Sequence, residues 1–172
     1  MYKDDPLSRV LVGCWSKLTP LRRRIRAAAS ILAHAMESTD TALSSLFGVV
    51  ALEHLLKEGD SSFAEVEAMA CSAVEGPTAR EDISRLFSNR HEVSHEAKAP
   101  AGGHQHSQEI FTAWAVFAFA AKAASIKLSS VKEFREHLRG RVLARQTGEQ
   151  LREKGKSELA DKVELESTDL GS

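Results

Sequence analysis

The sequence predicts an all-α protein, an up-and-down bundle of about five to six helices. Apolar residues recur every three to four positions through most of the chain, which is the spacing of one helix face. No run of alternating β-branched residues, no Asn-Gly hairpin and no strand–helix–strand rhythm breaks this pattern. At 172 residues with 42% apolar content, the chain is long enough to bury a core as one domain.

Residues that cap or end a helix mark the boundaries of the predicted elements. Asp40 is suited to accept backbone N–H groups of a first helical turn, and Gly59 suits a helix end. Ser61 or Ser62 caps the next helix, with Glu65 in the position of a capping-box acid. The expected helices cover residues 7–18, 21–36, 41–57, 63–74, a stretch from 78 into the segment 89–96, 107–126 and 131–145.

We expect three regions along the chain. Residues 1–20 form an N-terminal helical extension, residues 21–146 the helical domain, and residues 147–172 a charged tail that is either a marginal helix or disordered. Within the domain, residues 97–106 are the clearest loop. The helix over 107–126 is apolar nearly all round, which is typical of a central core helix.

Composition and charge exclude several classes of protein. The formal charge of -1 gives no global attraction to nucleic acid or membrane, so a site for a polyanion must be local. The longest apolar stretch, 111–121, is too short to span a bilayer, and the polar start of the chain is unlike a signal peptide. Cys14 and Cys71 form no disulfide framework, so we expect reduced thiols and a cytoplasmic protein.

The segment 89–96, Asn-Arg-His-Glu-Val-Ser-His-Glu, fits two chemistries that exclude each other. Arg90 and His95, with a polar His91 after the arginine, form the R-x4-H pattern of metal-free RNA cleavage. His91, Glu92 and His95 form H-E-x-x-H, the pattern of a zinc hydrolase with Glu92 as general base.

The zinc interpretation is the weaker of the two. A catalytic zinc needs a third protein ligand, and the nearby candidates, His104 and His106, stand in a Gly-rich loop at no recognised spacing. Zinc proteases usually place this helix beside a β-sheet, and none is predicted here. Charged Arg90 and Glu96 flank a motif that normally has uncharged neighbours. We therefore expect no metal and no other cofactor.

Residues 22–145 resemble the HEPN superfamily, most closely its Apea-like branch. The segment 46–56 is similar to the "ALE-x-LL" helix of that branch, and 82–96 is similar to its "I-x-x-L-Y-x-x-R-[polar]-x-I-V-H-G" segment. Phe87 stands where Tyr is common, and Ser94 and Glu96 replace the usual Val and Gly. The last two helices, 107–126 and 130–145, also follow the layout of the family.

The resemblance implies a metal-independent endoribonuclease. The ribose 2′-OH would be the nucleophile, His95 would act as general base or acid, and Arg90 would stabilise charge on the phosphorane-like transition state. Residues five apart lie about 140° apart on a helix, so one chain need not bring both groups together. The family solves this by pairing two motifs in a homodimer. Asn89 and His91 would be supporting donors.

Other residues are candidates for substrate binding. Arg22, Arg23, Arg24 and Arg26 form a basic cluster that could hold RNA phosphates, with Arg22, Arg23 and Arg26 as the candidate contacts. His104 and His106 could touch substrate. The expected partners are RNA, a second copy of the chain, and a larger bacterial anti-phage defence or toxin–antitoxin component, with no membrane.

Two further possibilities stay open besides the nuclease. One is a HEPN-like module that binds RNA, a nucleotide or a protein without cleaving, and the other is the zinc hydrolase. Arg90 could also be structural and pair with Glu92 or Glu96.

Overall fold

The computed structural model describes residues 18–96, 104–126 and 128–168, and every regular element in these ranges is an α-helix. The all-α prediction is therefore confirmed. The helix expected over 7–18 falls, except for Leu18, outside the described residues. The helices are α2 (Pro20–Glu37), α3 (Thr41–Leu56), α4 (Phe63–Ala73), α5 (Pro77–Glu96), α6 (His104–Ile126), α7 (Val131–Glu153) and α8 (Ser157–Thr168).

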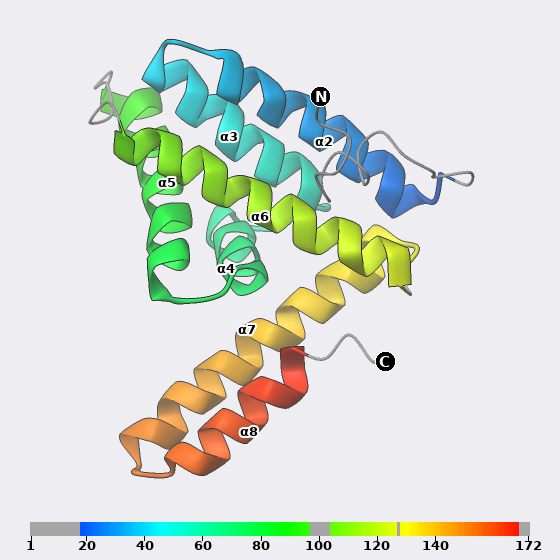
Figure 1. Cartoon of the computed structure of the whole chain (residues 1–172), viewed down its shortest axis with the longest axis vertical. Helices are drawn as coiled ribbons and strands as arrows, with labels where there is room; N and C mark the ends of the chain where they lie inside the picture. Colours follow the sequence, from blue (N-terminus) through cyan, green and yellow to red (C-terminus); the bar gives the residue numbers. More distant parts are fainter. Residues whose placement is uncertain (1–17, 97–103, 127, 169–172) are drawn as a thin grey trace, which may run out of the picture.

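The helices form a body and an arm. In the body, α2, α3 and α6 lie side by side, and α4 and α5 pack beneath them (Figure 1). The arm consists of α7 and α8, an antiparallel pair that extends away from the body, with α7 packed on α4 near its first half. The segment that resembles the nuclease motif forms the last turns of α5 and so belongs to the body.

Helix α6 is the centre of the body. It contacts α2, α3, α4 and α5, and its buried face carries several small residues that let neighbouring helices approach closely. This is the position expected for the apolar helix. Within the described ranges it is also the one helix that is long and apolar enough, over residues 106–126, to cross a membrane. More than half of that stretch is buried inside the body. Its buried apolar residues include Ile110, Ala113, Val116, Phe117 and Ala120.

Local caps fix several helix starts as the sequence predicts. The Asp40 carboxylate accepts the amides of Ala42 and Leu43, at 2.8 and 3.2 Å. Ser62 accepts the Glu65 amide at 3.1 Å. Ser130 and Glu133 form a complete capping box at the start of α7.

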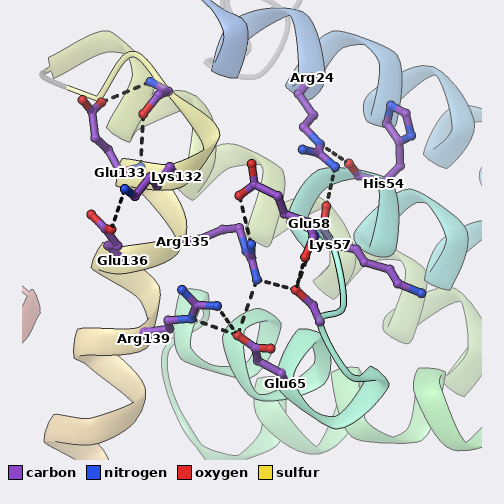
Figure 2. A network of polar contacts seen from close by, with 12 residues as sticks. Arg24, His54, Lys57, Glu58, Glu65, Lys132, Glu133, Arg135, Glu136 and Arg139 are labelled. Carbon is purple, nitrogen blue, oxygen red and sulfur yellow. Dashed lines mark hydrogen bonds and ion pairs between the residues drawn. The ribbon is translucent and has the colours of Figure 1, made fainter.

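The capping-box role predicted for Glu65 is wrong. Its carboxylate binds two arginines of α7 instead: Arg139 at 2.6 Å and Arg135 at 3.4 Å (Figure 2). Arg135 is only 4% exposed and also binds Glu58 at 3.0 Å and the Ser61 hydroxyl. A charge-assisted bond to a guanidinium is stronger than a bond to a neutral amide, which explains why the carboxylate turns towards α7.

Arginines of α2 fasten that helix to both of its neighbours. Arg24 donates to the carbonyls of His54, at 2.6 Å, and Lys57, where α3 ends (Figure 2). Arg22 donates to the Ala124 carbonyl near the end of α6, at 3.0 Å. The Leu21 amide also donates to the Ser129 carbonyl at 3.1 Å, so the start of α2 is bonded to the junction between α6 and α7.

The charged C-terminal region is helical. Helix α7 continues past residue 145 to Glu153, and α8 packs back along it. Arg152 pairs with Asp161 at 2.9 Å and with Glu164 at 2.7 Å. Gly148 leaves room for the Glu164 side chain, since a β-carbon there would lie 2.2 Å from its Oε1.

Candidate functional site

The R-x4-H segment lies on a continuous helix. Helix α5 runs from Pro77 to Glu96, so residues 89–96 are its last two turns. His91 and Glu92 are exposed. The side chain of His95 lies outside the part of the chain that the structure describes, so its predicted meeting with Arg90 stays a prediction.

Arg90 points towards α3 and α4. Its Nη2 lies 3.7 Å from Oε2 of Glu53, and its guanidinium lies over the ring of Phe63, 4.8 Å from the centroid. The side chain is 30% exposed. Its buried Nε has no hydrogen-bond acceptor among the residues described. The ion pair of Arg90 is therefore with α3, whereas its neighbour Glu92 is exposed.

Glu53 is held between two cations. Its carboxylate is 17% exposed and also lies 3.8 Å from Nζ of Lys57, one turn further along α3. Glu53 is the acidic residue of the "ALE-x-LL"-like segment. The ion pair with Arg90 thus joins the two segments on which the family resemblance rests.

A second group of polar residues lies between α5 and α6, and the sequence analysis missed it. Asp82, Arg85 and Asn89 are three and four residues apart, so they share one face of α5. Arg85 pairs with Asp82 and lies 3.4 Å from the Glu109 carboxylate. Asn89 donates to Glu109 at 2.8 Å, and the Thr112 hydroxyl donates to Asp82 at 2.9 Å. Asp82 and Glu109 are each only 2% exposed.

His106 belongs to this buried group. The sequence placed His104 and His106 in a loop, but α6 already begins at His104, so that prediction is wrong. His106 is 6% exposed, and its Nδ1 lies 3.4 Å from the Ser45 hydroxyl and 3.6 Å from Glu109. These buried partners on α3 and α6 explain why the chain is already helical here. The side chain of His104 is not among those described.

Burial dominates the electrostatics of Glu109. Burial raises the pKa of Glu109, and this effect exceeds the opposing influence of His106 and Arg85. Two buried carboxylates, Asp82 and Glu109, share one arginine, so keeping both charged in this place is costly. The sequence signal was a set of polar residues at helical spacing on α5 and on the apolar helix α6, but nothing in the sequence said that the two sets face each other.

A cavity of about 330 Å³ lies beside His106. Its wall is largely apolar, and Phe111 on it is 68% exposed. Nε2 of His106 is buried and has no hydrogen-bond partner in the described part of the chain, so it could serve a ligand. Residues around the cavity include Met36, Ser38, Ser44, His106, Ile110 and Phe111.

The predicted basic cluster of α2 is divided between two roles. Arg22 and Arg24 bind carbonyls of neighbouring helices, as described above. Arg23 and Arg26 are exposed on α2. These two are therefore the members of the cluster placed to meet a ligand in solution.

Among the side chains described, no three of His, Cys, Asp or Glu are gathered in a way that could hold a metal ion. His95 and His104 are outside that set.

Comparison of the chain with family models, with curated proteins and with solved structures gave no significant match. Membership of the HEPN superfamily stays a prediction that rests on the residues quoted above.

Proposed function

We propose that the chain is a metal-independent endoribonuclease of HEPN type that acts as a homodimer. The observation that carries the proposal is the position of Arg90. A carboxylate and an aromatic ring orient its guanidinium while leaving it 30% exposed, so the planar fork is held in place yet reachable. A donor fixed before the substrate arrives is what stabilisation of a transition-state charge requires.

The proposed reaction uses the RNA as its own nucleophile. The ribose 2′-OH attacks the adjacent phosphorus while His95 of one motif removes its proton. The bond from phosphorus to the 5′ oxygen breaks, and a protonated imidazole supplies the proton to the leaving oxygen. Arg90 stabilises the added charge on the phosphoryl oxygens. The products are a 2′,3′-cyclic phosphate and a 5′-hydroxyl.

The proposed setting is the bacterial cytoplasm. An enzyme that cuts RNA without a cofactor suits an anti-phage defence system or a toxin, with a larger defence or antitoxin protein as partner. The acting state is a dimer whose two-fold axis passes near residues 90–95, because one helix separates Arg90 and His95 by about 140°. Light scattering at tens of micromolar should give the mass of a dimer. A monomer, or a dimer with the two His95 residues on distant faces, would overturn this.

Labelled RNA in EDTA tests the activity. The wild type should cleave, and His95→Ala should abolish cleavage without a loss of helical circular dichroism. Arg90→Ala should lose activity comparably, and Arg90→Lys should not restore it, because a point charge does not replace the planar fork.

Glu92→Ala is the matched control, since Glu92 is exposed on the same turn. It should leave cleavage nearly unchanged. The zinc hydrolase instead makes Glu92 its general base and requires activity to collapse, together with stoichiometric zinc that is lost on changing His91 or His95.

A non-catalytic binding module is the second candidate. The ion pair between Arg90 and Glu53 favours it, since it gives Arg90 a purely structural use. In that case the wild type should leave diverse RNAs intact. Arg90→Ala should then lower the free energy of unfolding, and there should be no RNA cleavage for it to affect.

A further inference from the structure

Another polar site lies at the opposite end of α5 from Arg90. A cavity of about 140 Å³ opens where the end of α4, the start of α5, the middle of α7 and the end of α8 meet. Arg80 and Arg90 are about 15 Å apart along the helix axis, so this cavity is separate from the proposed nuclease site. Polar residues that line it include Cys71, Ser72, Arg80, Arg141, Arg145 and Ser167.

Arg141 is the unusual member of this group. It is only 9% exposed, and its guanidinium lies over the ring of Phe119, 4.6 Å from the centroid. No hydrogen-bond acceptor and no carboxylate within ion-pair distance contacts it in the described ranges. Burial is the largest effect and lowers the pKa of Arg141. The negative charge of Glu75 raises this pKa, and the positive charge of Arg80 lowers it further. A buried charge without a hydrogen-bonded partner is costly, so an anion bound beside Arg141 would be stabilising.

The two other arginines leave most of their donors for a ligand. Arg80 uses Nε on the Gly76 carbonyl at 3.1 Å. Arg145 is 24% exposed, and its contact with Glu149, one turn away on α7, is a long one of 3.8 Å. Both line the cavity with Arg141.

The two carboxylates that line the cavity offset only part of the charge of the three arginines that line it. Glu75 and Glu164 line it, but Oε1 of Glu164 already binds Arg152 at 2.7 Å. Three arginines and two carboxylates thus line the cavity, and one of these carboxylates is already paired with Arg152. The cavity therefore favours a compact anion.

We propose that this cavity binds the phosphoryl group of a small phosphorylated molecule, held by Arg80, Arg141 and Arg145. Guanidinium forks match the oxygens of a phosphoryl group with paired charge-assisted hydrogen bonds. A volume of about 140 Å³ admits that group and little more. A neighbouring cavity of about 330 Å³ shares Cys71, Arg80 and Arg145, and this cavity has room for the organic part of the molecule.

The bound phosphoryl group joins the arm to the body. The cavity takes Arg80 from α5, Arg141 and Arg145 from α7, and Ser167 from α8. Helix α8 otherwise packs along α7. Binding should therefore slow the opening of α8.

Calorimetric titration of the full chain tests the proposal, with inorganic phosphate and AMP as probes at constant ionic strength. Saturable binding at one site per chain is expected for at least one probe. If phosphate and AMP bind with similar affinity, the cavity is a site for free phosphate. If AMP binds at least about tenfold more tightly than phosphate, the ligand is a phosphorylated organic molecule. Hydrogen exchange of the α8 amides should slow in the presence of the bound probe.

Variants of α7 decide whether the cavity is responsible. R141Q should weaken binding at least about tenfold, and R145Q, at a more exposed position, gives the same readout if R141Q does not fold. R139Q removes an equal charge from the same helix outside the cavity and should change affinity less than about twofold. The proposal fails if neither probe saturates or if R139Q weakens binding as much as R145Q.

Discussion

Asn89 on α5 and Glu109 on α6 are joined by a partly buried hydrogen bond of 2.8 Å, from Nδ2 to Oε2. The half-buried residue next to Arg90 is therefore already bonded to α6, whereas the sequence suggested a donor for RNA. Asn89→Ala should lower the free energy of unfolding by about 1–3 kcal/mol, because a buried carboxylate loses a donor. Urea denaturation measures this. Ser88→Ala, on the exposed neighbour, should stay within about 0.5 kcal/mol of the wild type.

Glu53 is a positioning residue for Arg90 in the proposed nuclease. Glu53→Gln keeps the size of the side chain but removes the charge that orients the guanidinium. We expect kcat for RNA cleavage to fall about tenfold or more with KM little changed, and Glu53→Asp to restore part of kcat. A variant with unchanged kcat would show that Arg90 needs no orientation by α3.

The stability of the fold should depend on pH through Glu109. Burial raises the folded-state pKa of Glu109 above 4.5. The contribution of Glu109 to the free energy of unfolding is therefore fully present below pH 4.5 and is lost as pH rises through the raised pKa. Glu109→Gln removes this dependence. The unfolding free energy of the variant minus that of the wild type should therefore increase from pH 4.5 to 7.

Glu133→Gln is the control of opposite sign. Hydrogen bonds from the Ser129 and Ser130 amides lower the pKa of Glu133. The contribution of Glu133 to the free energy of unfolding is present above pH 4.5 and is lost as pH falls through the folded-state pKa. The wild type should therefore become more stable relative to Glu133→Gln as pH rises. Parallel curves for Glu109→Gln and the wild type would contradict the burial of an ionisable Glu109.

Gly48 allows α3 to approach α5 and α6 closely. A β-carbon there would lie 2.8 Å from Cδ1 of Ile110 and 3.3 Å from both terminal carbons of Leu86. Gly48→Ala should destabilise the fold by about 1–3 kcal/mol through overpacking. Gly140→Ala, within α7 and with no atom within 4 Å of the new carbon, should stabilise it by up to about 1 kcal/mol. Thermal unfolding compares the two, and a Tm that rises in both would mean that the core has room at residue 48.

Arg135 and Arg139 share the acceptor Glu65 but differ in burial, since their side chains are 5% and 50% exposed. Arg135→Met should cost about 1–3 kcal/mol, because Glu58 and Ser61 lose a buried donor as well. Arg139→Gln should cost less than about 1 kcal/mol. Equal losses in urea denaturation would show that the ion pair with Glu65 matters more than burial.

Helix boundaries were predictable because they are local. The caps Asp40 and Ser62 bond to amides two or three residues ahead, so a short stretch of sequence contains both partners. The same locality led to the error at Glu65. A nearby amide suited its carboxylate, but two arginines that come much later in the chain bind it instead.

The surroundings of the motif were not predictable from the segment itself. The partner of Arg90 comes from α3, and that of Asn89 from α6. Both contacts depend on which helices pack against α5. The sequence of a helix that is apolar nearly all round, such as α6, does not show which of its faces meets a given neighbour. His106 shows the same limit, since its burial depends on Ser45 of another helix.

The bond between the Leu21 amide and the Ser129 carbonyl has a consequence for how the chain folds as it is made. Translation adds about 5–20 residues each second, so roughly 100 residues separate the two partners by about 5–20 s. For most of that time α2 and α3 can pair as a hairpin, whereas α6, which begins at His104, has not yet been made to cover them. A nascent chain stalled before His104 therefore exposes the apolar seam of an unfinished body, which is a surface that chaperones recognise.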